Sequence, residues 1–138
     1  MPSERDYLIL TNNPLVARCM SDRFTVRLEE DMTYRDILVL ARDMVYEGHT
    51  LYTHPLSGSV KPNETPYKSV VVSKVPHTFS PEQAEIMGNA IVAFDKFTPR
   101  KVVLTDKIRE DFQLIDYTLL SGALNFDAAA GLSKSVQP

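Results

Sequence analysis

The chain contains no tryptophan and only one cysteine, Cys19. A single cysteine cannot form an internal disulfide, which excludes the disulfide frameworks of small secreted proteins. The chain also lacks an apolar run near the ~20 residues that span a bilayer, and its first residues, MPSERDY, contain no apolar signal region. We therefore expect a cytoplasmic protein without a membrane partner, in which Cys19 is a small buried hydrophobe rather than a reactive thiol.

An excess of positive charge is missing as well. The 15 lysines and arginines are scattered along the chain and are outnumbered by 18 aspartates and glutamates, for a net charge of −3. Nucleic-acid-binding proteins usually concentrate basic residues on one face or stretch. The charge pattern therefore predicts no nucleic-acid partner.

What is present is a globular composition, with 43% hydrophobic and 24% charged residues in 138 residues. This length fits one domain with one core, so we expect a single α/β domain over residues 1–138. Small residues without a helical or strand period follow Asn125. They predict a frayed tail over residues 126–138.

Short apolar runs alternate with segments of helical period along the chain. Strands are expected at residues 7–10, 24–28, 51–53 and 70–72, and a fifth strand or a buried extended segment at 102–104. Helices are expected at residues 15–20, 34–47 and 81–97 and from residue 106 onward. Because helices connect parallel strands, this order predicts a small three-layer Rossmann-like sandwich with a mainly parallel sheet of four or five strands. Strand order and the direction of the fourth strand stay open.

Two helix starts carry strong local signals. Thr33 can cap the second helix with Asp36 in the box position, and Ser80 followed by Pro81 can cap the third. Gln83 can then return a hydrogen bond to the Ser80 backbone. Gly48 follows the second helix, where a left-handed residue would end it.

The stretch Thr53–Ser69, THPLSGSVKPNETPYKS, separates two expected strands with three prolines and almost no large apolar side chain. Connections between strands usually take a handful of residues, and prolines restrict both themselves and the residues before them. We therefore interpret the stretch as a stiff site loop. In a parallel sheet, ligands bind beyond the carboxyl ends of strands, which would place this loop beside Asn12 and Asn13.

The chemistry of the loop favours an anion. Gly58 can adopt positive φ, which lets backbone N–H groups converge on a carboxylate or phosphate between the hydroxyls of Ser57 and Ser59. Lys61 and Lys68 add positive charge. The alternative is that Ser-Gly-Ser forms a plain turn.

Other polar residues near the loop complete the candidate site. His54 is the candidate catalytic residue, as a general acid or base, although its ring could instead cap loop carbonyls. Asn12, Asn13, Asn63 and Tyr67 are candidate ligand contacts, against the alternatives of a routine turn for the asparagines and packing for the tyrosine. The three histidines lack clustered carboxylates or a second cysteine, so we predict no metal and no cofactor.

Three segments together resemble the GrdX family, small proteins encoded beside the glycine, sarcosine and betaine reductase genes of anaerobic bacteria. They are Gly48–Val70, Thr11–Pro14 (TNNP) and Asp111–Asp116 (DFQLID). The most specific part is His54–Ser69, HPLSGSVKPNETPYKS, which shows no departure from the family pattern. The resemblance spans about residues 6–125. It implies an accessory member of a selenium-dependent amino-acid reduction system and no defined reaction.

Three functions are therefore open at this point. The first is an accessory protein that binds a glycine or betaine reductase component or a small anionic metabolite. The second is a small enzyme in which His54 is the acid or base and Lys61 or Lys68 the electrostatic partner of a carboxylate or phosphate substrate. The third is a regulatory module that senses such a metabolite. A homo-oligomer is compatible with each.

Overall fold

The computed structural model describes residues 4–56, 64–97 and 103–135. Its regular elements follow one another as a short 3-10 helix (Glu4–Asp6), β1 (Tyr7–Thr11), α1 (Pro14–Met20), β2 (Thr25–Leu28), α2 (Tyr34–Tyr46), β3 (Ser69–Ser73), α3 (Pro81–Asp95), α4 (Asp106–Ala123) and α5 (Ala128–Ser135).

The sheet of the described residues has three strands in the order β2-β1-β3. β1 and β2 are parallel, with Ile9 opposite Val26, whereas β1 and β3 are antiparallel, with Ile9 opposite Val71. The fold is mixed α/β. The predicted Rossmann-like sandwich with four or five mainly parallel strands was therefore wrong.

The expected strand at residues 51–53 explains most of the difference. The segment runs along the outer edge of β3, where Tyr52 N–H donates to the Val71 carbonyl and Ser73 N–H to the Thr50 carbonyl, each at 2.8 Å. Thr53 Oγ1 then accepts the Val71 N–H at 3.0 Å in place of a backbone carbonyl, and only one isolated bridge, Leu51 to Val72, remains. β3 runs antiparallel both to this segment and to β1.

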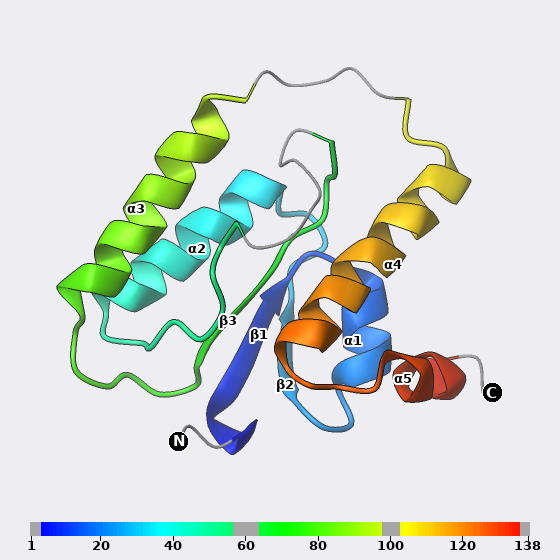
Figure 1. Ribbon diagram of the computed structural model, residues 1–138, viewed down its shortest axis with the longest axis horizontal. Helices are drawn as coiled ribbons and strands as arrows, with labels where there is room; N and C mark the ends of the chain where they lie inside the picture. Colours follow the sequence, from blue (N-terminus) through cyan, green and yellow to red (C-terminus); the bar gives the residue numbers. More distant parts are fainter. Residues whose placement is uncertain (1–3, 57–63, 98–102, 136–138) are drawn as a thin grey trace.

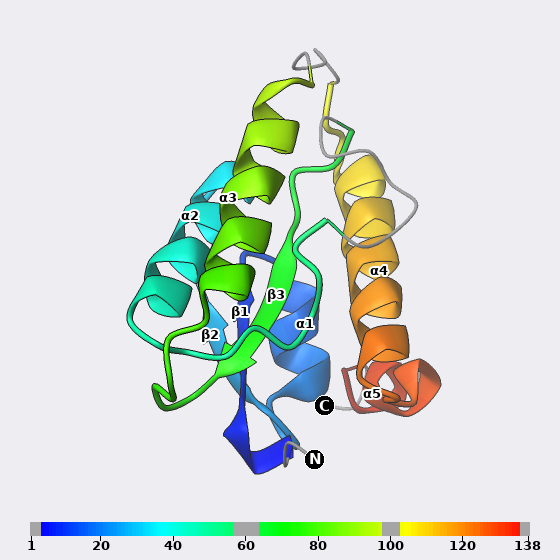
Figure 2. The same cartoon turned by 60° about the vertical axis from the view of Figure 1, so that its left-hand side comes forward.

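Helices cover both faces of the sheet (Figures 1 and 2). α2 and α3 lie on one face, where Leu10, Val70 and Val72 are fully buried among their apolar side chains. α1 and α4 lie on the other face against Ile9 and Val71. Each such buried aliphatic side chain contributes about 1.5–3 kcal/mol to folding, so β3, buried along its whole length, is a central element of both cores.

The local helix signals are largely confirmed. Thr33 and Asp36 form the reciprocal capping box of α2, and Ser80 caps α3 with Pro81 in its first turn. Gly48 has φ +103°, as expected after α2. The predicted return bond from Gln83 was wrong, because its side-chain amide instead holds the backbone N–H and carbonyl of Leu51.

The segment before α4 differs from the expected fifth strand. Val103 and Leu104 have no strand partner among the described residues, and Val103 is 82% exposed; Val102 lies outside the described residues. α4 itself begins as expected, since Thr105 Oγ1 accepts the Ile108 N–H.

Helix α5 occupies most of the segment for which we expected a frayed tail. It docks where Tyr117 Oη donates to the Ala128 carbonyl at 2.7 Å, and Ala128 and Leu132 pack against the core on the α1 side of the sheet. Gly131 lies so close to its neighbours that a Cβ there would be 2.2 Å from Tyr117 Oη and 3.2 Å from Cys19 Cβ. The helix escaped prediction because small residues, rather than a periodic apolar stripe, form its interface.

Candidate ligand-binding site

A cavity of about 40 Å³ lies between the start of β3 and α4. By volume it has room for roughly three water-sized groups. Its polar lining includes Tyr34, Thr53, Tyr67, Lys68, Ser69 and Asp116. Its apolar wall comes from Ile115, Leu119, Leu120 and Ala123 of α4.

Lys68 brings a buried positive charge to this cavity. The residue is 6% exposed, and its Nζ lies 5.5 Å from the centroid of the Tyr34 ring. Within the part of the chain that the structure describes, no group accepts a hydrogen bond from Nζ. Burial lowers the pKa of Lys68 from 10.5 to about 8, and the opposing charge of Asp116 limits the fall. The ammonium is therefore largely desolvated, faces the Tyr34 ring and has no hydrogen-bond acceptor among the described residues.

Asp116 brings the opposite charge from α4. Its Oδ2 accepts hydrogen bonds from Asn13 Nδ2 at 3.0 Å and from Ser69 Oγ at 2.8 Å. The pKa of Asp116 is raised, because burial outweighs these two hydrogen bonds and the charge of Lys68, which lower it. The pKa of the Tyr34 phenol is raised, chiefly by burial and further by the negative charge of Asp116.

A chain of hydroxyl groups orients this carboxylate. Asn13 N–H donates to Thr11 Oγ1 at 2.9 Å, and Thr11 Oγ1 lies 2.7 Å from Ser69 Oγ. Because the single Ser69 proton goes to Asp116, Thr11 must donate to Ser69. Every hydroxyl in the chain is therefore satisfied and points toward the carboxylate.

Asn12 fixes the chain that carries Lys68. Its Nδ2 donates to the Met32 and Pro66 carbonyls at 3.0 and 2.8 Å, and its Oδ1 accepts the Lys68 N–H at 2.9 Å. One buried amide thus joins the end of β1 to the turn before α2 and to the segment that enters β3. Asn12 does not line the cavity.

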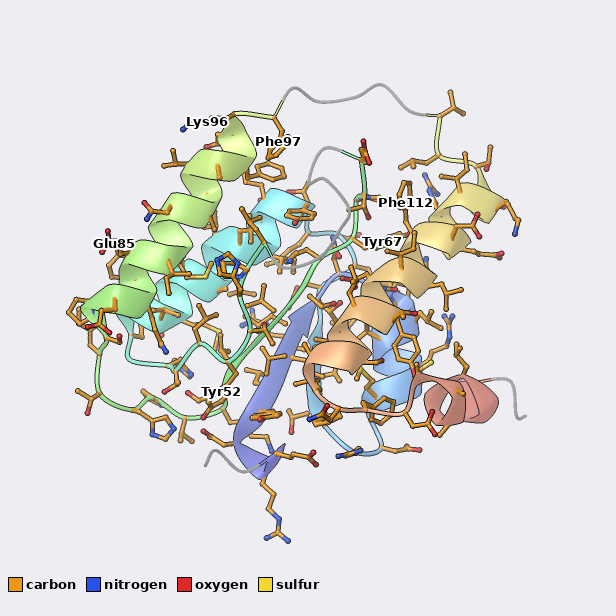
Figure 3. The ribbon with its side chains drawn as sticks, viewed as in Figure 1. Tyr52, Tyr67, Glu85, Lys96, Phe97 and Phe112 are labelled. Atoms are coloured by element: carbon orange, nitrogen blue, oxygen red, sulfur yellow. The ribbon has the colours of Figure 1, made fainter. Side chains whose placement is uncertain are left out.

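Asn13 fixes α4 in the same way. Its Oδ1 caps α1 by accepting the Leu15 N–H, and its Nδ2 donates both to Asp116 and to the Gln113 carbonyl at 2.9 Å. Gln113 Nε2 in turn donates to Tyr67 Oη at 2.9 Å, and Figure 3 shows Tyr67 on the segment that leads into β3 beside α4. Tyr67 lines the cavity, whereas Asn13 does not.

The other predicted site residues are not part of this cavity. His54 is exposed and is absent from the lining; its Nδ1 accepts the Leu56 N–H at 3.1 Å. Ser57, Gly58, Ser59, Lys61 and Asn63 lie outside the described residues. Of the predicted ligand contacts, the structure therefore brings Tyr67 and Lys68 to one cavity and uses Asn12 and Asn13 to position its walls.

Sequence reasoning missed Asp116, Ser69 and Tyr34 as site residues. A signal for Asp116 was available, because it lies four residues from both Phe112 and Leu120 and so falls on the buried stripe of its helix. A carboxylate in that position needs a partner. Nothing local marks Ser69 or Tyr34, since their roles depend on contacts with segments far away in sequence.

The described residues contain no group of three or more histidine, cysteine, aspartate or glutamate side chains placed to hold a metal ion. Among the same residues, no helix combines the length and apolar character required to cross a bilayer.

Comparison with known proteins gives a family but no individual relative. The model of the family described as GrdX-like protein matches residues 8–125. This range includes β3 and α4, which lie on either side of the cavity. No curated protein and no solved structure matches the chain. Because the family model covers well over half of the sequence, the chain belongs to the GrdX-like protein family.

Proposed function

We propose that this protein is an accessory member of a glycine reductase-related system that binds a small carboxylate-bearing metabolite in the Lys68 cavity. The family supports the association with such a system. The observation that carries the binding proposal is the Lys68 ammonium, which is buried at the cavity without a hydrogen-bond acceptor among the described residues.

The energetics favour an anionic ligand. A buried ammonium without a partner is unfavourable, and a hydrogen bond between charged groups contributes about 1.5–3 kcal/mol. A ligand carboxylate would supply both the missing acceptor and the counter-charge. The small cavity volume restricts the ligand to a few non-hydrogen atoms, which excludes nucleotides from the buried part of the site.

The structure gives less support to the enzyme hypothesis. His54, the candidate acid or base, does not line the cavity that holds Lys68 and Asp116. The proposal therefore assigns His54 no chemical role and describes the protein as a binding module, either an accessory or a sensor of the metabolite.

Isothermal titration calorimetry with acetate and with glycine at pH 7 tests the binding proposal. We expect at least one of them to bind the native protein, and Lys68→Met to weaken that binding at least tenfold. Lys74→Met, which removes an exposed lysine at the other end of β3, is the matched control and should leave binding unchanged. Absence of binding to the native protein, or equal binding by Lys68→Met, would contradict the proposal.

A further inference from the structure

The Lys68 cavity contains two opposite charges that do not pair with each other. Lys68 and Asp116 both line it, and each charge affects the pKa of the other group, yet no ion pair joins them. Two desolvated charges of opposite sign normally gain by direct contact. Here Lys68, directly before β3, and Asp116, on α4, line the same cavity without forming an ion pair.

The carboxylate of Asp116 is only half satisfied. Asn13 and Ser69 both donate to Oδ2, and no described group donates to Oδ1. The Thr11–Ser69 hydroxyl chain prevents the carboxylate from turning freely, because rotation would break bonds that are each 2.7–2.8 Å long. Among the described residues, one oxygen of Asp116 and the ammonium of Lys68 therefore have no hydrogen-bond partner.

Resting on the proposed function, we infer that the ligand is a small zwitterion whose carboxylate binds Lys68 and whose ammonium group binds Asp116. Such a molecule gives each buried charge an opposite partner and leaves the cavity neutral. A plain carboxylate would pair with Lys68 but would approach the Asp116 carboxylate as a like charge, which is unfavourable. A plain amine would pair with Asp116, but its positive charge would be repelled by the Lys68 ammonium.

The remaining wall restricts the zwitterion further. Ile115, Leu119, Leu120 and Ala123 offer no hydrogen-bonding side chain, and the volume is about 40 Å³. A large side chain on the ligand would exceed this volume. The inferred ligand class is therefore an α-amino acid with no side chain or a very small one.

Competition between matched fragments tests this inference on the native protein. Glycine carries both charged groups, acetate lacks the ammonium and methylamine lacks the carboxylate. We expect calorimetry at pH 7 to show glycine binding at least tenfold more tightly than acetate or methylamine. Equal affinities for glycine and acetate would overturn the zwitterion inference while leaving carboxylate binding intact, whereas binding of neither would overturn the proposed function itself.

The variant Asp116→Asn separates the two charges. The variant should weaken glycine binding at least tenfold. It should leave acetate binding unchanged or make it tighter, because the like charge of Asp116 is removed. Asp111→Asn, on the exposed side of the same helix, is the matched control and should keep the native preference. Circular dichroism establishes that each variant is folded; if Asp116→Asn is not, the native fragment ratios decide. An unchanged glycine-to-acetate ratio in folded Asp116→Asn would refute the inference.

Discussion

Replacing the buried Lys68 by methionine should stabilise the protein at neutral pH and change how its stability depends on pH. Burial holds the pKa of Lys68 at about 8 in the folded state, against 10.5 for the exposed side chain. At about 1.36 kcal/mol for each tenfold change in proton affinity, this difference means that the charged lysine costs about 3 kcal/mol of folding free energy. Methionine has a similar length and no charge to desolvate.

The sign follows from proton binding. Below pH 8 both states hold the proton and the full cost is present; between pH 8 and 10.5 the unfolded chain holds more protons, so native stability rises with pH. From pH 7 to pH 9.5 the rise from this residue is about 2 kcal/mol. Urea unfolding at both pH values should therefore show the advantage of Lys68→Met shrinking by about that amount, while Lys74→Met shows no such change. Parallel pH profiles for the native protein and Lys68→Met would refute the reasoning.

Three further predictions concern packing and hydrogen bonds. Gly131→Ala should destabilise the protein by about 1–3 kcal/mol in urea unfolding, because the added Cβ would collide with Tyr117 Oη. Gly88→Ala, in open space on α3, is the control and should be neutral or stabilise the protein by up to about 1 kcal/mol. Equal effects of the two substitutions would contradict the docking of α5. Asn12→Ala should cost at least about 2 kcal/mol, since three backbone groups lose their partner, and a neutral result would contradict the contacts assigned to this amide. Hydrogen bonds from the His77 and Tyr52 side chains lower the pKa of Asp6, so the stability that Asp6 contributes is lost as the pH falls through that pKa. Asp6→Asn should therefore make the loss of stability on acidification shallower. An unchanged dependence of the melting temperature on acidic pH would contradict this prediction.

The features that could be predicted from sequence are those decided within a few residues. The Thr33 and Ser80 caps depend on side chains three positions apart, and the left-handed Gly48 depends on its own lack of a Cβ. The family resemblance likewise rests on contiguous strings and was confirmed over residues 8–125.

The features that could not be predicted depend on pairing between distant segments. Residues 51–53 have a strand-like sequence, but Thr53 ends the ladder with its own hydroxyl, so the strand count was wrong. The cavity is a similar case. Lys68 was selected for its charge alone. Its burial beside Asp116 arises only because the segment that enters β3 packs against α4, 48 residues further along the chain.

The amide of Asn12 has a mechanical consequence. A single side chain links the exit of one strand, the turn ahead of α2 and the backbone of Lys68. None of these three segments can shift without straining or breaking a bond to the other two, so they open and close as one cooperative unit. The backbone of Lys68, which lines the cavity, is thereby tied to the entry of α2, on the opposite side of the sheet from α4.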